Sequence, residues 1–172
     1  MTRVAALLGF CLACCVSTGR LLAAEEATPR WTAATWNGER AFAAASGEWE
    51  AIVSVDRGRL VHLGKRHGGP NALFAPATRD DPAGWGGHRV WLGPQSAWSA
   101  GWPPPTAWEA SAADRVERQN DRLELTMPNS GEGWSRLKRI YFWRGEKLHC
   151  VVRMEPGTRA AQIIQIVQVP PA

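Results

Sequence analysis

Hydrophobic and polar residues alternate along most of the chain after residue 30, and this two-residue period is typical of half-buried β-strands. Residues 48–55 and 59–64 form two such runs, separated by the turn sequence Asp-Arg-Gly. Glycine and proline in residues 68–71 end the second run, because proline cannot donate to a strand ladder. The pattern therefore predicts two neighbouring strands followed by a loop, which continues over residues 75–87.

Two hairpins are predicted in the second half of the chain. Residues 114–118 and 122–127 flank Gln-Asn-Asp, and residues 134–143 and 147–154 flank Arg-Gly-Glu. Connections this short require antiparallel neighbours, since a parallel crossover needs a dozen or more residues. A final run rich in isoleucine and valine covers residues 158–169.

Helical periodicity is nearly absent, and the alanine-rich residues 41–45 are the only short candidate. We therefore predict an all-β chain, folded as an antiparallel β-sandwich over residues 48–172. A lead-in segment over residues 25–47 is predicted to precede it.

The first 24 residues have the layout of a secretory signal peptide. Arg3 is followed by an apolar run over residues 4–16, and small residues end the segment at Ala24. The run is too short to span a bilayer, and the alternative is a buried amino-terminal helix. A lipoprotein, acylated at Cys14 or Cys15, is a further alternative. We predict a periplasmic or secreted protein, with membrane attachment only if the amino terminus carries lipid.

The predicted signal peptide also determines how many cysteines the mature chain keeps. Three of the four cysteines lie in the predicted signal, so the mature chain keeps Cys150 alone and cannot form an internal disulfide. Its alternating surroundings predict a buried structural thiol; the alternative, a nucleophile, would need a neighbour that lowers the thiol pKa. The chain has no Cys/His spacing for zinc or haem, so we predict no metal site and no cofactor.

The charge balance argues against nucleic acid as a partner. The formal charge is +4, from 20 Lys and Arg against 16 Asp and Glu. Arg3 and Arg20 lie in the predicted signal, which leaves the mature chain nearly neutral. Such a chain lacks the electrostatic attraction on which phosphate binding depends.

The most unusual segment covers residues 84–109, where five of the ten tryptophans lie among glycines and prolines. An indole has a broad apolar face, which suits the C–H face of a pyranose, and polar side chains at its rim suit the sugar hydroxyls. We select His88 first as a functional donor. The full candidate ligand-binding set is Asn71, Trp85, His88, Arg89, Gln95, Trp98, Trp102 and Glu109. The alternatives are that indoles pack in the core and that Arg89 pairs with a carboxylate.

These residues resemble a known family. The succession GGHRVWLGPQ, WPPP and WE, preceded by RLVHLG and GGPNALF and followed by IIQIVQVPP, resembles the first half of a bacterial family of exported proteins. That family is related to galactose mutarotases, the aldose 1-epimerases. The resemblance covers roughly residues 49–171. It implies a β-supersandwich and a sugar cleft lined by the glycine-rich residues 86–89.

The same resemblance argues against catalysis in this chain. In mutarotase-like proteins a histidine and a carboxylate act across the sugar as acid and base, and the carboxylate lies in the last third of a longer chain. Glu109 and Glu132 are available near the tryptophan-rich segment, but neither matches that position. We expect either a partial supersandwich or a smaller closed sandwich. The expected function is carbohydrate binding; an aldose epimerase-like enzyme and a non-catalytic cell-envelope interaction protein are the alternatives.

Overall fold

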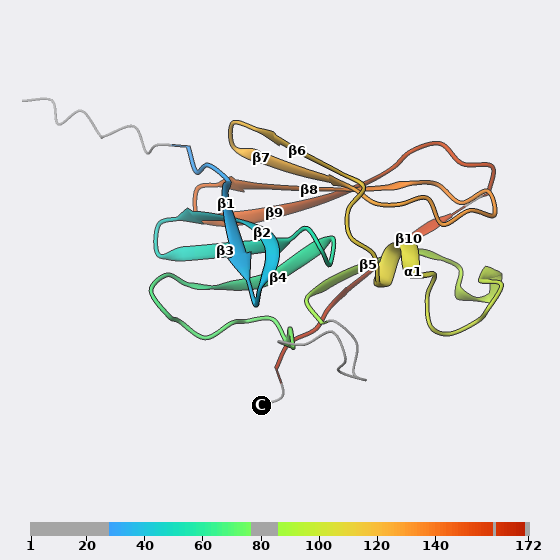
Figure 1. Cartoon of the computed structure of the whole chain (residues 1–172), viewed down its shortest axis with the longest axis horizontal. Helices are drawn as coiled ribbons and strands as arrows, with labels where there is room; N and C mark the ends of the chain where they lie inside the picture. The colour runs from blue at the N-terminus through green and yellow to red at the C-terminus, as the bar shows by residue number, and fades with distance from the viewer. Residues whose placement is uncertain (1–27, 77–85, 160, 171–172) are drawn as a thin grey trace, which may run out of the picture.

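Ten β-strands in three antiparallel sheets form the framework of the computed structural model, which describes residues 28–76, 86–159 and 161–170 (Figure 1). In chain order the strands are β1 (Thr32–Trp36), β2 (Glu39–Ser46), β3 (Trp49–Ser54), β4 (Arg59–Lys65), β5 (His88–Gly93), β6 (Arg115–Gln119), β7 (Arg122–Thr126), β8 (Leu137–Arg144), β9 (Lys147–Met154) and β10 (Gln162–Val167). The predicted signal peptide, residues 1–24, lies outside the described residues.

The first sheet has the order β1-β2-β3-β4 and begins well before residue 48. Its first two strands lie in the predicted lead-in segment, residues 25–47, and β2 pairs with β1 over residues 39–43 and with β3 over residues 41–46. The helical candidate at residues 41–45 was wrong, because these alanines lie inside β2. Alanine favours helices intrinsically, but pairing on both edges of β2 and burial of Ala41 and Ala44 outweigh that preference.

The second sheet has the order β6-β7-β8-β9 and contains both predicted hairpins. Asn120 and Gly145 lie at their turns with φ angles of 46° and 54°, in the left-handed region that asparagine and glycine tolerate best. The third sheet pairs β5 with β10, which are nearly 70 residues apart in the chain. The predicted strand at residues 158–169 is thus shorter in the structure and completes this distant pair.

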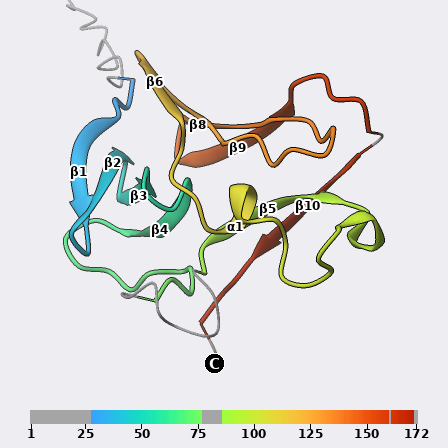
Figure 2. The same cartoon turned by 45° about the vertical axis from the view of Figure 1, so that its right-hand side comes forward.

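Two apolar clusters hold the sheets together. Figure 2 shows how the sheets are arranged. The first cluster lies between the β1–β4 and β6–β9 sheets and includes Trp31, Val53 and Tyr141. The second lies against the inner side of β5 and includes Val90 and Leu137. The prediction of an all-β antiparallel sandwich is confirmed, while the finer mutarotase-like arrangement stays a prediction.

The helical elements are short. They are a 3₁₀ turn, η1 (Gln95–Ala97), and a single turn of α-helix, α1 (Thr106–Glu109). Within the described residues, no helix has the length and apolar character needed to cross a membrane. Both elements lie in the tryptophan-rich segment, residues 84–109, which therefore consists of strand β5 followed by a structured loop.

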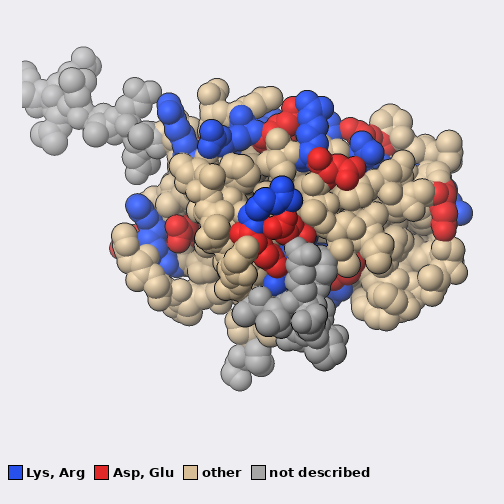
Figure 3. Space-filling view, viewed as in Figure 1, with Lys and Arg blue, Asp and Glu red and all other residues tan. Residues whose placement is uncertain are grey.

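Charged side chains of both signs are scattered over the face shown in Figure 3, which is mostly uncharged. Basic groups gather along its upper margin, with acidic groups among them. On the β6–β9 sheet, Arg115 and Glu117 form an ion pair of 2.7 Å, and Lys138 pairs with Glu155 at 3.1 Å. Exposed pairs of this kind contribute little to stability.

Candidate functional site

Two of the predicted ligand-binding residues pair with each other in the interior. Glu109, at the end of α1, lies 2.7 Å from a guanidinium nitrogen of Arg89 and accepts a hydrogen bond of 2.8 Å from the Trp91 indole. Arg59 on β4 approaches the same carboxylate at 3.5 Å. All four side chains are buried. A buried carboxylate needs such partners, so the alternative for Arg89, pairing with a carboxylate, is confirmed and neither residue is available to a ligand.

A further arginine ties this interior together. Arg139 on β8 is fully buried and donates to the carbonyl oxygens of Val90 and Trp108, at 3.1 and 3.0 Å, and to that of Gly58. Burial lowers the pKa of Arg139, and it lowers the pKa of Arg59 to about 10, so Arg59 remains cationic at neutral pH. These guanidinium groups join β5, α1 and the turn after β3, which is a structural role.

His88 lies inside the molecule as well, in a chain of hydrogen bonds. Its Nε2 is 3.0 Å from the amide oxygen of Gln165 on β10, and its Nδ1 is 3.3 Å from the sulfur of Cys150 on β9. Because an amide oxygen only accepts, Nε2 carries the proton and Nδ1 accepts from the thiol. Burial lowers the pKa of His88 and raises that of Cys150 to about 11. The thiol is therefore protonated, and the nucleophilic thiolate is disfavoured.

Asn71 is occupied by its own loop. Its amide oxygen accepts hydrogen bonds of 3.0 Å from the backbone of Leu63 and Leu73, and its amide nitrogen donates to the Val61 carbonyl at 2.8 Å. The bonds with Leu63 and Val61 attach the segment after β4 to that strand, and the bond from Leu73 lies within the segment. Asn71 therefore stabilises the fold and offers nothing further to a ligand.

The indoles divide into buried and exposed groups. Trp98 is buried, donates to the Leu92 carbonyl at 2.7 Å, and packs edge-to-face against Trp91 and Trp108. Trp102, in contrast, exposes 59% of its surface and leans on Trp98 with 6.5 Å between ring centroids. Core packing, the alternative for the indoles, thus holds for Trp98 and not for Trp102.

Two further predicted residues complete the set. Gln95 is exposed in η1, and Trp85 lies outside the described residues. The seven predicted residues that the structure describes therefore do not form one site. They divide among the interior ion pairs, the histidine chain, the β4 loop and the surface near η1.

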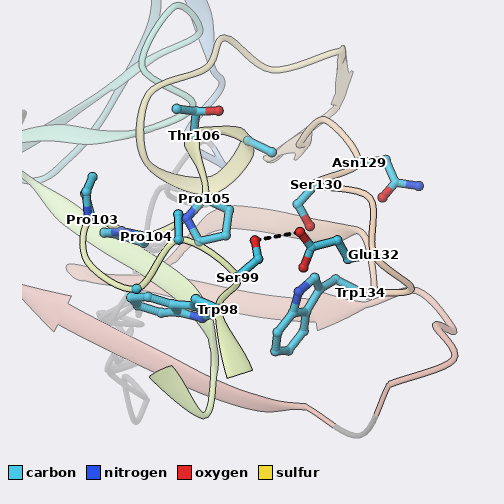
Figure 4. A pocket seen from close by; sticks show the side chains of 13 residues that line it. Trp98, Ser99, Pro103, Pro104, Pro105, Thr106, Asn129, Ser130, Glu132 and Trp134 are labelled. Carbon is cyan, nitrogen blue, oxygen red and sulfur yellow. Dashed lines mark hydrogen bonds between the residues drawn. The ribbon is translucent and has the colours of Figure 1, made fainter. Parts of the chain in front are cut away.

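A pocket of about 360 Å³ lies instead between two loops, residues 98–107 and 129–134. Figure 4 shows Trp98 and the three consecutive prolines on one wall, with Ser130, Glu132 and Trp134 on the other. Its volume is at the lower end of the range for small-molecule sites, roughly 300–1,000 Å³. Trp98 is the one predicted residue that lines it, while exposed Trp102 lies in the chain between lining residues Gly101 and Pro103.

The polar groups of this pocket are the best evidence for a ligand. Ser99 reaches across it and donates to the Glu132 carboxylate at 2.6 Å. The indole N–H of Trp134 and the hydroxyl of Ser130 are buried without a hydrogen-bond partner among the described residues. Buried polar groups are normally paired, so two such groups at one pocket point to a partner that binds there.

Glu132 is held toward the pocket by an unusual backbone. Its φ of 57° lies in the left-handed region, and Gly131 and Gly133 on either side have φ angles of 77° and 78°. Left-handed backbone is costly for glutamate and free for glycine. In the sequence, Glu132 is recognisable only as a carboxylate near the tryptophan-rich segment. The glycines around it indicate a tight loop, but no local signal shows that this loop meets residues 98–107.

Comparison of the chain with protein-family models, curated proteins and solved structures found no match. The resemblance to mutarotase-related proteins therefore stays an expectation, and the candidate site depends on its own geometry.

Proposed function

We propose that the protein is an exported carbohydrate-binding protein, whose site is the pocket between residues 98–107 and 129–134 with Trp102 at its rim. One observation carries this proposal. The exposed Trp102 indole lies close to a pocket at which the Ser130 hydroxyl and the Trp134 N–H have no hydrogen-bond partner among the described residues. A sugar ring would stack on the apolar face of Trp102, and its hydroxyls would pair with Ser130, Glu132 and the Trp134 N–H.

The composition of the pocket favours binding over catalysis. Of the described residues that line it, Glu132 is the only one with an ionisable side chain. Epimerisation at an anomeric centre needs both an acid and a base across the sugar, and His88 is buried elsewhere against Gln165 and Cys150. Export is supported by the signal-like residues 1–24, and a sugar ligand by the mutarotase-like motifs of the chain.

The proposal is tested by titrating the protein with a panel of neutral, amino and acidic saccharides, followed by tryptophan fluorescence and calorimetry. Trp102→Ala should weaken binding about fivefold, since a lost aromatic contact is worth about 1 kcal/mol. Trp102→Phe keeps an aromatic face and should retain most of the affinity. Both variants should keep the thermal midpoint because Trp102 is exposed. A folded protein that responds to no saccharide in the panel would overturn the proposal.

A second candidate, a non-catalytic interaction protein of the cell envelope, is favoured by a different region. Strands β9 and β10 each pair on one side only, and exposed apolar side chains lie on them, including Met154, Ile163 and Val167. Open strand edges with apolar side chains are surfaces that other chains can cover. Stoichiometric co-purification of an envelope protein, lost on Val167→Lys and unaffected by Trp102→Ala, would favour this function over sugar binding.

A further inference from the structure

The charge of the pocket bears on the kind of saccharide it takes. Glu132 is the single charged side chain among the described lining residues, and its one hydrogen bond there comes from the uncharged Ser99 hydroxyl. No Lys, Arg or His within the described ranges forms an ion pair with it. The carboxylate is therefore uncompensated at a site where a ligand would bind.

A nearby cation does not change this balance, because it is engaged elsewhere. Arg159 lies over the Trp134 ring with 5.1 Å between the guanidinium carbon and the ring centroid. It also donates a hydrogen bond of 2.9 Å to the Ala97 carbonyl. These contacts fix the guanidinium against the loop that carries Trp134. The charge opposite Glu132 must then come from the ligand.

The backbone fixes where this carboxylate lies. The glycines on both sides of Glu132 have left-handed backbone, and so does Glu132 itself. A Cβ at Gly133 would lie 2.2 Å from the Thr158 hydroxyl oxygen, so the loop packs closely on the segment after β9. A non-glycine residue in left-handed backbone costs free energy, and such residues cluster at functional sites.

We propose, on the basis of the carbohydrate function above, that the pocket selects saccharides carrying a protonated amine. An ammonium group donates charge-assisted hydrogen bonds to a carboxylate, and these are stronger than the bonds of a neutral hydroxyl or amide. Glu132 is exposed, so a ligand can reach its carboxylate, and the apolar walls formed by Trp98 and the prolines lie across the pocket from it. A carboxylate-bearing sugar is repelled by the same group.

The test compares glucosamine with N-acetylglucosamine, and short oligomers of each, by calorimetry at about pH 6.5, where amines are protonated and carboxylates ionised. The amine form should bind about tenfold more tightly than the acetylated form. In Glu132→Gln, which keeps an oxygen for Ser99, the ratio of the two affinities should fall to about one. Glu48→Gln removes the same charge from the exposed turn before β3 and should keep the preference.

The outcomes separate this inference from the proposed function. Equal binding of both forms overturns the amine preference and leaves carbohydrate binding intact. Absence of all saccharide binding overturns both. An amine preference that persists in Glu132→Gln overturns the assignment to this carboxylate. Raising the salt concentration for the unmodified protein gives a second readout, because only the charged ligand should lose affinity as the ion pair is screened.

Discussion

Glu109 and the groups around it show how much one buried carboxylate can organise. It follows Trp108 in a proline-rich segment and accepts bonds from Arg89 and Trp91, with Arg59 close by. Removing its charge leaves two buried guanidinium groups without their common counter-ion. The free-energy cost is dominated by those unpaired charges rather than by the lost bond itself.

We therefore expect Glu109→Gln to lower the free energy of unfolding by about 3–5 kcal/mol, measured by chemical denaturation. Glu48→Gln is the matched control, because it removes a carboxylate from an exposed pair with Lys65 and should cost less than about 1 kcal/mol. Equal losses in the two variants would show that the interior pairing contributes no more than a surface one.

The role of Glu109 could not be predicted from the sequence. Its partners lie 20 and 50 residues earlier, and nothing in the local pattern shows that β4 and β5 fold against α1. For the same reason the sequence predicted His88 as a functional donor beside two glycines, whereas Gln165 and Cys150 meet it only after the chain has folded. The chemistry of these residues was evident, but their partners were not.

At the scale of elements, what is local could be predicted and what is distant could not. Turn residues next to alternating runs predicted both hairpins of the β6–β9 sheet. The β5–β10 pair joins two segments far apart in the chain, and the sequence of neither strand indicates which strand it pairs with. The pocket has the same origin, since loops 98–107 and 129–134 meet only through tertiary packing.

The segment after β4 offers a test at this scale. Asn71→Ala removes three side-chain bonds, two of which attach the segment to β4, and leaves the Leu63 N–H and the Val61 carbonyl without this partner. We expect a loss of about 2–3 kcal/mol in unfolding free energy and faster proteolysis within residues 66–75. Asn71→Asp keeps both accepted bonds and should fall between Ala and the unmodified protein. Equal protease resistance in all three proteins would contradict this role.

At the scale of the whole molecule, two histidines, the buried His88 and the half-buried His62, link stability to pH. Burial is the largest cause that lowers the pKa of both His88 and His62 below the ordinary 6.5. As the pH falls below about 6.5, these histidines become protonated in the unfolded chain before they do so in the folded chain. The folded state therefore loses stability. The contribution of both groups is complete above the unfolded pKa and declines as the solution becomes acidic.

The thermal midpoint should therefore fall between about pH 7 and about pH 5, when it is followed by circular dichroism. His88→Gln should reduce this dependence, and the double variant with His62→Gln should reduce it further. A midpoint that rises on acidification, or a double variant with the full dependence, would show that other groups control it.

Arg139 also affects the order in which the molecule can assemble. Its guanidinium group meets carbonyl oxygens from three separate parts of the chain, at Gly58, Val90 and Trp108. In an intermediate in which only two of these parts are in place, the buried Arg139 guanidinium would have an N–H donor without its carbonyl acceptor. Partly assembled forms are thus penalised, and the sheets should melt together in one cooperative transition rather than one after another.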